Sequence, residues 1–134
     1  MARVLIVHTS WYKNYITEMV DISRESLKNL YEVDIAIAPG SIELAALAKN
    51  KINKKEYAGL LFIGIVIRGE TSHYDLVTSE TFRSIGSLAE NFCDLAIINN
   101  VICVENEDQL KERFSKVTLN NTKALIDLIN EKSS

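Results

Sequence analysis

The chain has 134 residues, of which 47% are hydrophobic and 25% are charged, and its formal net charge at pH 7 is -3. This composition is typical of one globular domain with a buried core. With 15 Lys and Arg against 18 Asp and Glu, and no basic run, we expect no binding to nucleic acid or to a membrane surface. No apolar segment reaches the roughly 18 residues of a membrane span, and the N-terminus lacks a signal-length apolar stretch, so we expect a cytoplasmic protein.

Cys93 and Cys103 are the only cysteines, and no Cys/His cluster has the spacing of metal ligands. We expect both to be reduced, buried, small apolar residues. The chain has only one proline and five glycines, so most of it must be helix and strand joined by tight loops. We therefore expect Pro39-Gly40 and Gly69 to lie where the backbone has an unusual conformation or function.

The first half of the chain alternates apolar runs with amphipathic segments. Residues 4–7 form a continuous aliphatic run, typical of a strand buried on both faces. From about Asn14 to Leu30 apolar residues recur at spacings of three and four, which predicts a helix. A second strand is predicted over 33–38, before Pro39, and Ser41 is predicted to cap a helix that extends to about Ile52.

The second half repeats this alternation. Residues 60–67 are the most apolar run and predict the central strand. After a polar loop, a long helix is predicted over 76–92, and a fourth strand begins at Leu95 and extends toward Cys103. Two helices are predicted to end the chain, at about 108–116 and 121–129.

Strands that alternate with helices in this way require crossover connections, which give a parallel sheet with helices on both faces. The predicted fold is therefore an α/β three-layer sandwich of flavodoxin-like type, with four parallel strands in a single domain over residues 1–134. In such sheets ligands bind outside the carboxyl ends of the strands. The three polar loops at residues 9–11, 39–43 and 68–73 should share that edge.

The third of these loops has two interpretations. Gly69 allows close backbone approach, and the following helix start has free amides and a positive dipole end, which suit a phosphate. Thr71 or Ser72 could equally be a simple N-cap, and Glu70 opposes an anion unless its side chain points away. His73 lies where an imidazole could transfer protons, although an isolated histidine is often structural.

The other candidate residues each have a functional and a structural interpretation. Glu43 is either a charge that favours a helix start or an acceptor for polyol hydroxyls. Trp11, the only tryptophan, follows a strand end and could stack on a planar ring, but a core or interface role fits as well. Arg113 lies on the polar side of a short predicted helix, where a solvated role is the simplest.

Residues 64–75, Gly-Ile-Val-Ile-Arg-Gly-Glu-Thr-Ser-His-Tyr-Asp, resemble the signature of the lumazine synthase family, also called the riboflavin synthase beta chain. Two more segments match at the family's spacing: residues 39–44, Pro-Gly-Ser-Ile-Glu-Leu, and residues 10–12, Ser-Trp-Tyr. The similarity covers about residues 3–114. It is specific, because the central motif also falls in the strand-loop-helix context predicted above.

The resemblance implies that the chain condenses 5-amino-6-(D-ribitylamino)uracil with 3,4-dihydroxy-2-butanone 4-phosphate. The products are 6,7-dimethyl-8-ribityllumazine, phosphate and water, in riboflavin biosynthesis. The amine attacks the ketone to form an imine, phosphate is eliminated, and the ring closes. No metal and no redox cofactor is implied.

The resemblance also assigns site residues. Trp11 matches the position that stacks on the pyrimidine, and His73 matches the proton-transfer histidine. Arg113 matches an arginine that reaches the phosphate from the neighbouring subunit and neutralises it as it leaves. The remaining matches are to positions that bind substrate: Ser41, Ile42 and Glu43 at the ribityl chain, Val66 and Ile67 at the base, and Gly69, Glu70 and Thr71 at the phosphate.

This chain departs from the family pattern in three places. Asn99 occupies the position, at the end of the fourth strand, where most members carry an aromatic residue that lines the pocket across a subunit boundary, and Asn100 follows where glycine is common. After Arg113 the usual glycine- and lysine-rich turn is replaced by residues 114–121. Only two residues precede Arg3, so we also expect no counterpart of the family's usual extra strand there. A homo-pentamer is the expected assembly, with a shell of pentamers and association with riboflavin synthase as further options.

Three functions remain open from the sequence. The first is a working lumazine synthase that acts on two small-molecule substrates. The second is a non-catalytic oligomeric protein that binds flavin or lumazine on the same fold, which Asn99 and the altered turn favour. The third is a generic flavodoxin-like regulator that binds phosphate, which would require the motif match to be accidental.

Overall fold

The computed structural model describes residues 1–134 and centres on a parallel sheet with the strand order β2-β1-β3-β4. The strands are β1 (Arg3–His8), β2 (Glu32–Ile37), β3 (Gly59–Ile67) and β4 (Ala96–Val104). The helices are α1 (Lys13–Leu27), α2 (Leu44–Ile52), α3 (His73–Asn91) and α4 (Glu107–Ser133), and a 3₁₀ turn, η1 (Ser41–Glu43), precedes α2. The predicted α/β fold is confirmed.

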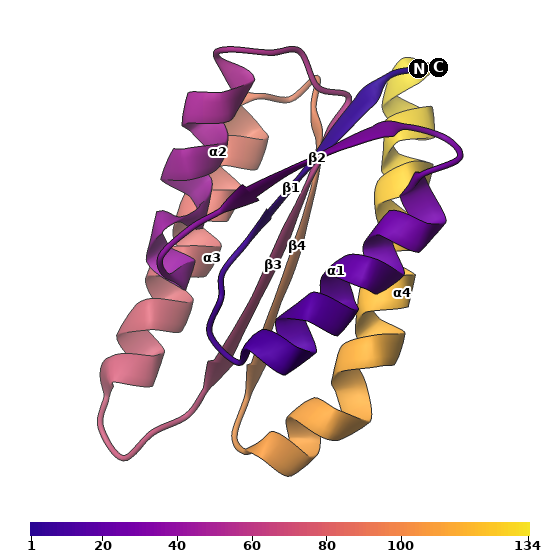
Figure 1. Ribbon diagram of the computed structural model, residues 1–134. Helices are drawn as coiled ribbons and strands as arrows, with labels where there is room; N and C mark the ends of the chain where they lie inside the picture. Colours follow the sequence, from indigo (N-terminus) through magenta and orange to yellow (C-terminus); the bar gives the residue numbers. More distant parts are fainter.

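Two helical layers enclose the sheet, with α1 and α4 on one face and α2 and α3 on the other (Figure 1). β3 shows why the sheet needs both layers, because residues 59–65 are buried on either side. Leu61, Ile63 and Ile65 pack toward α1 and α4, whereas Leu60 and Phe62 pack toward α2 and α3. None of the helices is both long enough and apolar enough to span a lipid bilayer.

The prediction of two C-terminal helices is wrong, because α4 is continuous from Glu107 to Ser133. Its inward positions at the predicted break are polar: Thr118 and Thr122 are fully buried. They are accommodated by hydrogen bonds, since Asn100 Nδ2 donates to Thr118 Oγ1 at 2.9 Å and Thr122 Oγ1 lies 2.8 Å from Ser23 Oγ. Asn121 Nδ2 also donates to Asn100 Oδ1 at 2.7 Å. An apolar pattern cannot reveal a helix face that is buried through such a network.

Two smaller predictions are also wrong. Ser41 is not a helix cap: it opens η1, and its hydroxyl instead faces β3, where a Cβ on Gly64 would lie 3.4 Å from it. Cys93 is exposed, because it lies in the turn between α3 and β4, and Cys103 is only partly buried. Ser72 is the N-cap residue of α3, but its side chain makes no capping hydrogen bond.

One polar cluster joins three segments near the amino ends of the strands. Asp34 of β2 accepts hydrogen bonds from Arg3 of β1 at 3.0 Å and from the Tyr57 hydroxyl at 2.7 Å, and Lys55 lies 3.4 Å away. The Tyr57 hydrogen bond, with help from Lys55 and Arg3, lowers the pKa of Asp34. Burial and the Asp34 carboxylate raise the pKa of Tyr57 to about 12.

We expect Asp34→Asn to lower the free energy of unfolding by about 1 kcal/mol at pH 7, because it weakens hydrogen bonds to a charged acceptor. The folded pKa of Asp34 lies below its unfolded value, so this stabilisation is complete above about pH 4 and is lost as the pH falls through the folded pKa. Urea unfolding at several pH values measures it. Glu32→Gln, at an exposed position of the same strand, is the control. Equal stabilities of Asp34→Asn and wild type at pH 7 would contradict the assignment.

Candidate functional site

The loops that leave β1, β2 and β3 meet at one edge of the sheet and enclose a cavity of about 410 Å³, the central cavity. Its lining combines aromatic, aliphatic and polar side chains with one histidine, which is typical of a small-molecule site. The lining residues are Trp11, Tyr12, Pro39, Gly40, Ser41, Ile42, Glu43, Ile65, Val66, Ile67, His73 and Val77.

Trp11 is held at the side of the central cavity by the loop after β2. Its indole Nε1 donates a hydrogen bond to the Pro39 carbonyl at 3.0 Å, yet 64% of the residue remains exposed. The indole is therefore oriented by a backbone contact while much of the ring remains free. This arrangement suits stacking on a planar ligand.

Glu43 lies directly against Gly40 in the second loop. A Cβ built on Gly40 would lie only 2.8 Å from Glu43 Oε1, so the glycine leaves the space that this carboxylate occupies. Ser41 is 8% exposed, and its hydroxyl forms no hydrogen bond within the chain, so it is available to a ligand. A carboxylate and a free hydroxyl therefore line the same side of the cavity.

The base of the central cavity is the carboxyl-terminal part of β3. β3 pairs with β1 only as far as Ile63, whereas it pairs with β4 as far as Ile67. Beyond Ile63 the β1 side of β3 has no strand partner. The Ile63 carbonyl faces that side, where it accepts from the Thr9 amide, whereas the Arg68 amide faces β4. Because backbone groups alternate along a strand, those of Ile65 and Ile67 are available to a ligand, whereas those of Val66 face β4. Ile65 is buried, Val66 and Ile67 are partly buried, and all three residues line the cavity.

His73 is the first residue of α3 and also lines the central cavity. Its backbone amide donates to Thr71 Oγ1 at 3.2 Å, which folds the preceding turn back onto the helix start. The imidazole is exposed and has no hydrogen-bond partner in the chain. It is therefore free to reach a bound ligand.

Five predicted site residues lie outside the lining of this cavity. Gly69, Glu70 and Thr71 belong to the adjacent exposed turn. Arg113 is exposed on α4, on the opposite face of the sheet from α2 and α3. Asn99 is not at the end of β4, as expected, but in its first half, because β4 extends to Val104; its Oδ1 accepts a hydrogen bond from the Val101 amide at 2.9 Å.

Tyr12, Ile65 and Val77 also line the central cavity, although no residue pattern assigned them to the site. Tyr12 is the only non-glycine residue with positive φ (61°), and its carbonyl accepts from the Tyr15 and Ile16 amides at the start of α1. A left-handed tyrosine next to the only tryptophan is a strained position of the kind that clusters at functional sites. Nothing in the residue pattern predicts that conformation.

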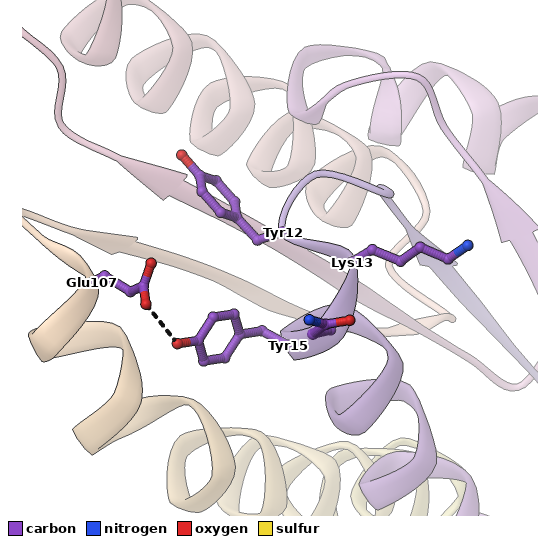
Figure 2. Close-up of a pocket in the computed structure, with 5 residues that line it drawn as sticks. Tyr12, Lys13, Tyr15 and Glu107 are labelled. Carbon is purple, nitrogen blue, oxygen red and sulfur yellow. Dashed lines mark hydrogen bonds between the residues drawn. The ribbon is translucent and has the colours of Figure 1, made fainter.

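A second pocket, of about 450 Å³, lies between the first turns of α1 and α4 and is lined by Tyr12, Lys13, Asn14, Tyr15 and Glu107. Figure 2 shows the Tyr15 hydroxyl directed at Glu107, to which it donates at 3.2 Å, while Tyr12 and Lys13 point elsewhere. Partial desolvation and this hydrogen bond raise the pKa of Tyr15. The pocket holds neither histidine of the chain, so the central cavity is the stronger candidate for chemistry.

We expect Tyr12→Gly to be more stable than Tyr12→Ala by about 1 kcal/mol, because both lose the ring but only glycine adopts positive φ without strain. The same pair at Glu18, an exposed position within α1, is the control. There the order should reverse, with glycine about 1 kcal/mol less stable than alanine. Thermal or urea unfolding measures all four variants. Tyr12→Ala equal to or more stable than Tyr12→Gly would contradict the strain at this turn.

Comparison with known proteins gives a consistent result. The family model for 6,7-dimethyl-8-ribityllumazine synthase matches residues 1–132. The protein of that name from Erythrobacter litoralis is 35% identical over 114 residues, which cover 84% of this chain and 80% of the relative. Its counterpart from Novosphingobium aromaticivorans is 34% identical (81% and 78% covered), and that from Neisseria gonorrhoeae is 29% identical (96% and 83% covered). The chain therefore belongs to the 6,7-dimethyl-8-ribityllumazine synthase family.

Proposed function

We propose that this chain condenses 5-amino-6-(D-ribitylamino)uracil with 3,4-dihydroxy-2-butanone 4-phosphate to form 6,7-dimethyl-8-ribityllumazine. One observation carries the proposal: an aromatic ring, a carboxylate, a free hydroxyl, an unpaired strand edge and a histidine line one cavity of about 410 Å³. The family membership and the names of the relatives support this transferase activity. They do not favour a non-catalytic binding protein.

The uracil substrate fits the side of the cavity formed by Trp11 and β3. Its planar ring stacks on the Trp11 indole, and its polar edge bonds to backbone groups of Ile67 beyond the end of β1, where Val66 also lines the cavity. The ribityl chain extends toward the second loop, where Glu43 and Ser41 accept and donate hydrogen bonds to its hydroxyls and Ile42 lies alongside. Each group in this set is already exposed to the cavity.

The phosphate of the second substrate is assigned to the turn between β3 and α3. Gly69 has no other atom within 4 Å of the position of a Cβ, so an anion can approach the backbone closely. The amide groups of Gly69, Glu70 and Thr71 and the positive end of α3 favour the negative charge. The Glu70 side chain is exposed and is assigned no contact with the phosphate.

The reaction requires several proton transfers near one centre. As the uracil amine attacks the ketone, a proton must leave the nitrogen and water must leave the carbon to give the imine. Elimination of phosphate then removes a proton from carbon as the C–O bond breaks, and ring closure releases a second water. His73 is the only titratable nitrogen in the cavity lining, and we assign these transfers to it. Holding both substrates side by side supplies the orientation.

The positions of Asn99 and Arg113 support an assembly with more than one subunit. Neither lines the central cavity of its own chain, so a role at a phosphate or a pyrimidine requires a neighbouring copy. We therefore propose a homo-pentamer in which Arg113 and Asn99 reach the adjacent site. A shell of pentamers, association with riboflavin synthase and a cytoplasmic location remain predictions, which sedimentation analysis, co-purification and fractionation would address.

We expect His73→Gln to lower kcat by about 100-fold, because the proton carrier is lost, while the Kd of the lumazine product changes less than threefold. Formation of the lumazine is followed optically against the spontaneous reaction of the two substrates. The other histidine, His8, lies on β1 outside the central cavity, and His8→Gln is the matched control. A wild-type rate no higher than the spontaneous rate, with ligand binding intact, would rule out the enzyme assignment.

We expect Gly40→Ala to weaken binding of the ribityl substrate about tenfold with little loss of stability. The new Cβ would meet Glu43 Oε1 at 2.8 Å, and this flexible carboxylate must move away from the position proposed to hold the ribityl hydroxyls. Gly40 has φ of −160°, which alanine adopts without strain. Calorimetry gives Kd. Gly86→Ala, where a Cβ meets nothing within 4 Å, is the control and should leave Kd unchanged. An unchanged Kd in Gly40→Ala would argue against Glu43 as a ribityl ligand.

A further inference from the structure

Arg68 directly follows β3 and begins the turn before α3. Its backbone amide donates to the Val104 carbonyl at 2.9 Å, which extends the ladder between β3 and β4 by one hydrogen bond. The side chain is exposed and does not line the central cavity. Arg68 therefore has no direct contact with the proposed reacting groups.

The Arg68 guanidinium connects two elements on either side of this turn. Nε donates to Glu105 Oε2 at 2.5 Å, immediately after β4, and Nη2 lies 3.4 Å from Asp75 Oδ1 in the first turn of α3. The guanidinium carbon also lies 4.3 Å from the centre of the Tyr74 ring, in a cation–π contact. A planar fork that reaches two carboxylates in this way is specific to arginine.

The turn that Arg68 begins has few other restraints. Residues 69–73 are exposed, and Gly69 has no atom within 4 Å of the position of a Cβ. One hydrogen bond from a side chain lies within it, between the His73 amide and Thr71 Oγ1 at 3.2 Å. The Ser72 carbonyl also accepts from the Asp75 and Leu76 amides at the start of α3. The contacts of Arg68 with Glu105, Tyr74 and Asp75 are the side-chain links that join the two ends of the turn.

We infer that Arg68 is a positioning residue, which fixes the turn over residues 69–73 so that its amides and the His73 imidazole face one bound substrate. The inference rests on the proposed function for the identity of that substrate. Tyr74 and Asp75 follow His73 directly, so a link that holds them also orients the start of α3. Glu105 anchors the link to the end of β4, which is a rigid element of the sheet.

A direct electrostatic role for Arg68 leads to a different expectation. Two carboxylates face one guanidinium, so the cluster carries a net negative charge beside the turn. If Arg68 acted only through its charge, removal of Glu105 would free that charge and improve use of the phosphate substrate. If Arg68 positions the turn, removal of Glu105 breaks the link and worsens it. The two roles thus predict opposite signs for the same variant.

The test compares Arg68→Met, Arg68→Lys and Glu105→Ala in the full-length protein. Misplacement of the turn should raise KM for the butanone phosphate about tenfold in Arg68→Met and about threefold in Glu105→Ala, with KM for the uracil substrate unchanged. Arg68→Lys keeps the charge but loses the fork, and should resemble Arg68→Met. The matched controls are Arg83→Met and Glu80→Ala, because that ion pair lies within α3 and spans no turn; both should behave as wild type.

A second readout does not depend on turnover. Amide hydrogen exchange over residues 69–73 should be at least several-fold faster in Arg68→Met and Glu105→Ala than in wild type, and unchanged in the two controls. Equal exchange and equal KM in Arg68→Met and Arg83→Met, or a lower KM for the phosphate substrate in Glu105→Ala, would overturn the inference. A wild-type protein without activity would overturn the proposed function instead, and the exchange rates would then decide the role of Arg68.

Discussion

The unequal lengths of neighbouring strands are the constraint on which the candidate site depends. β1 ends at His8 while β3 continues to Ile67, and the last register pair between them is His8 with Ile63. The chain leaving β1 must turn away there, and the Thr9 amide makes one final hydrogen bond to the Ile63 carbonyl at 3.2 Å. The overhanging part of β3 becomes the base of the cavity, and the loops after β1 and β2 become its walls.

Contacts within the chain fix the shape of the two loops that form the walls of the cavity. The indole of Trp11 is tied to the Pro39 carbonyl, so the first loop is braced against the second. The lack of a side chain at Gly40 lets the Glu43 carboxylate fold back, and Gly64 lets Ser41 pack onto β3. Binding groups held in this way need little reorganisation when a substrate arrives, which reduces the entropic cost of association.

Much of the fold could be predicted from the sequence, because its signals are local. The continuous apolar run over 60–67 and the three-four spacing in α1 led directly to a parallel sheet with helices on both faces. The continuity of α4 could not be predicted, since Thr118 and Thr122 look like solvent-facing residues until their partners on β4 and α1 are known. Asn100 on β4 and the buried polar side chains of α4 belong to that same hydrogen-bond network.

Part of the candidate site could also be predicted from the sequence, because the ends of parallel strands meet at one edge of the sheet, but the full set of lining residues could not. Trp11, Glu43 and His73 each follow or precede a strand or helix end at the same edge, so the topology alone brings them together. Tyr12 was missed because its left-handed backbone leaves no trace in residue type. Asn99 and Arg113 were assigned from the family resemblance and not from a place at this edge, and both lie outside the cavity lining.

The placement of the only tryptophan also determines which part of this protein intrinsic fluorescence can monitor. Trp11 is at the mouth of the cavity, with 64% of its surface in solvent, while the two apolar cores contain no indole. Intrinsic fluorescence excited at the tryptophan band is therefore a local sensor of whatever enters the cavity, without any attached dye. The same placement makes that emission a poor monitor of the cores, so the cooperative loss of the sheet is better followed by circular dichroism.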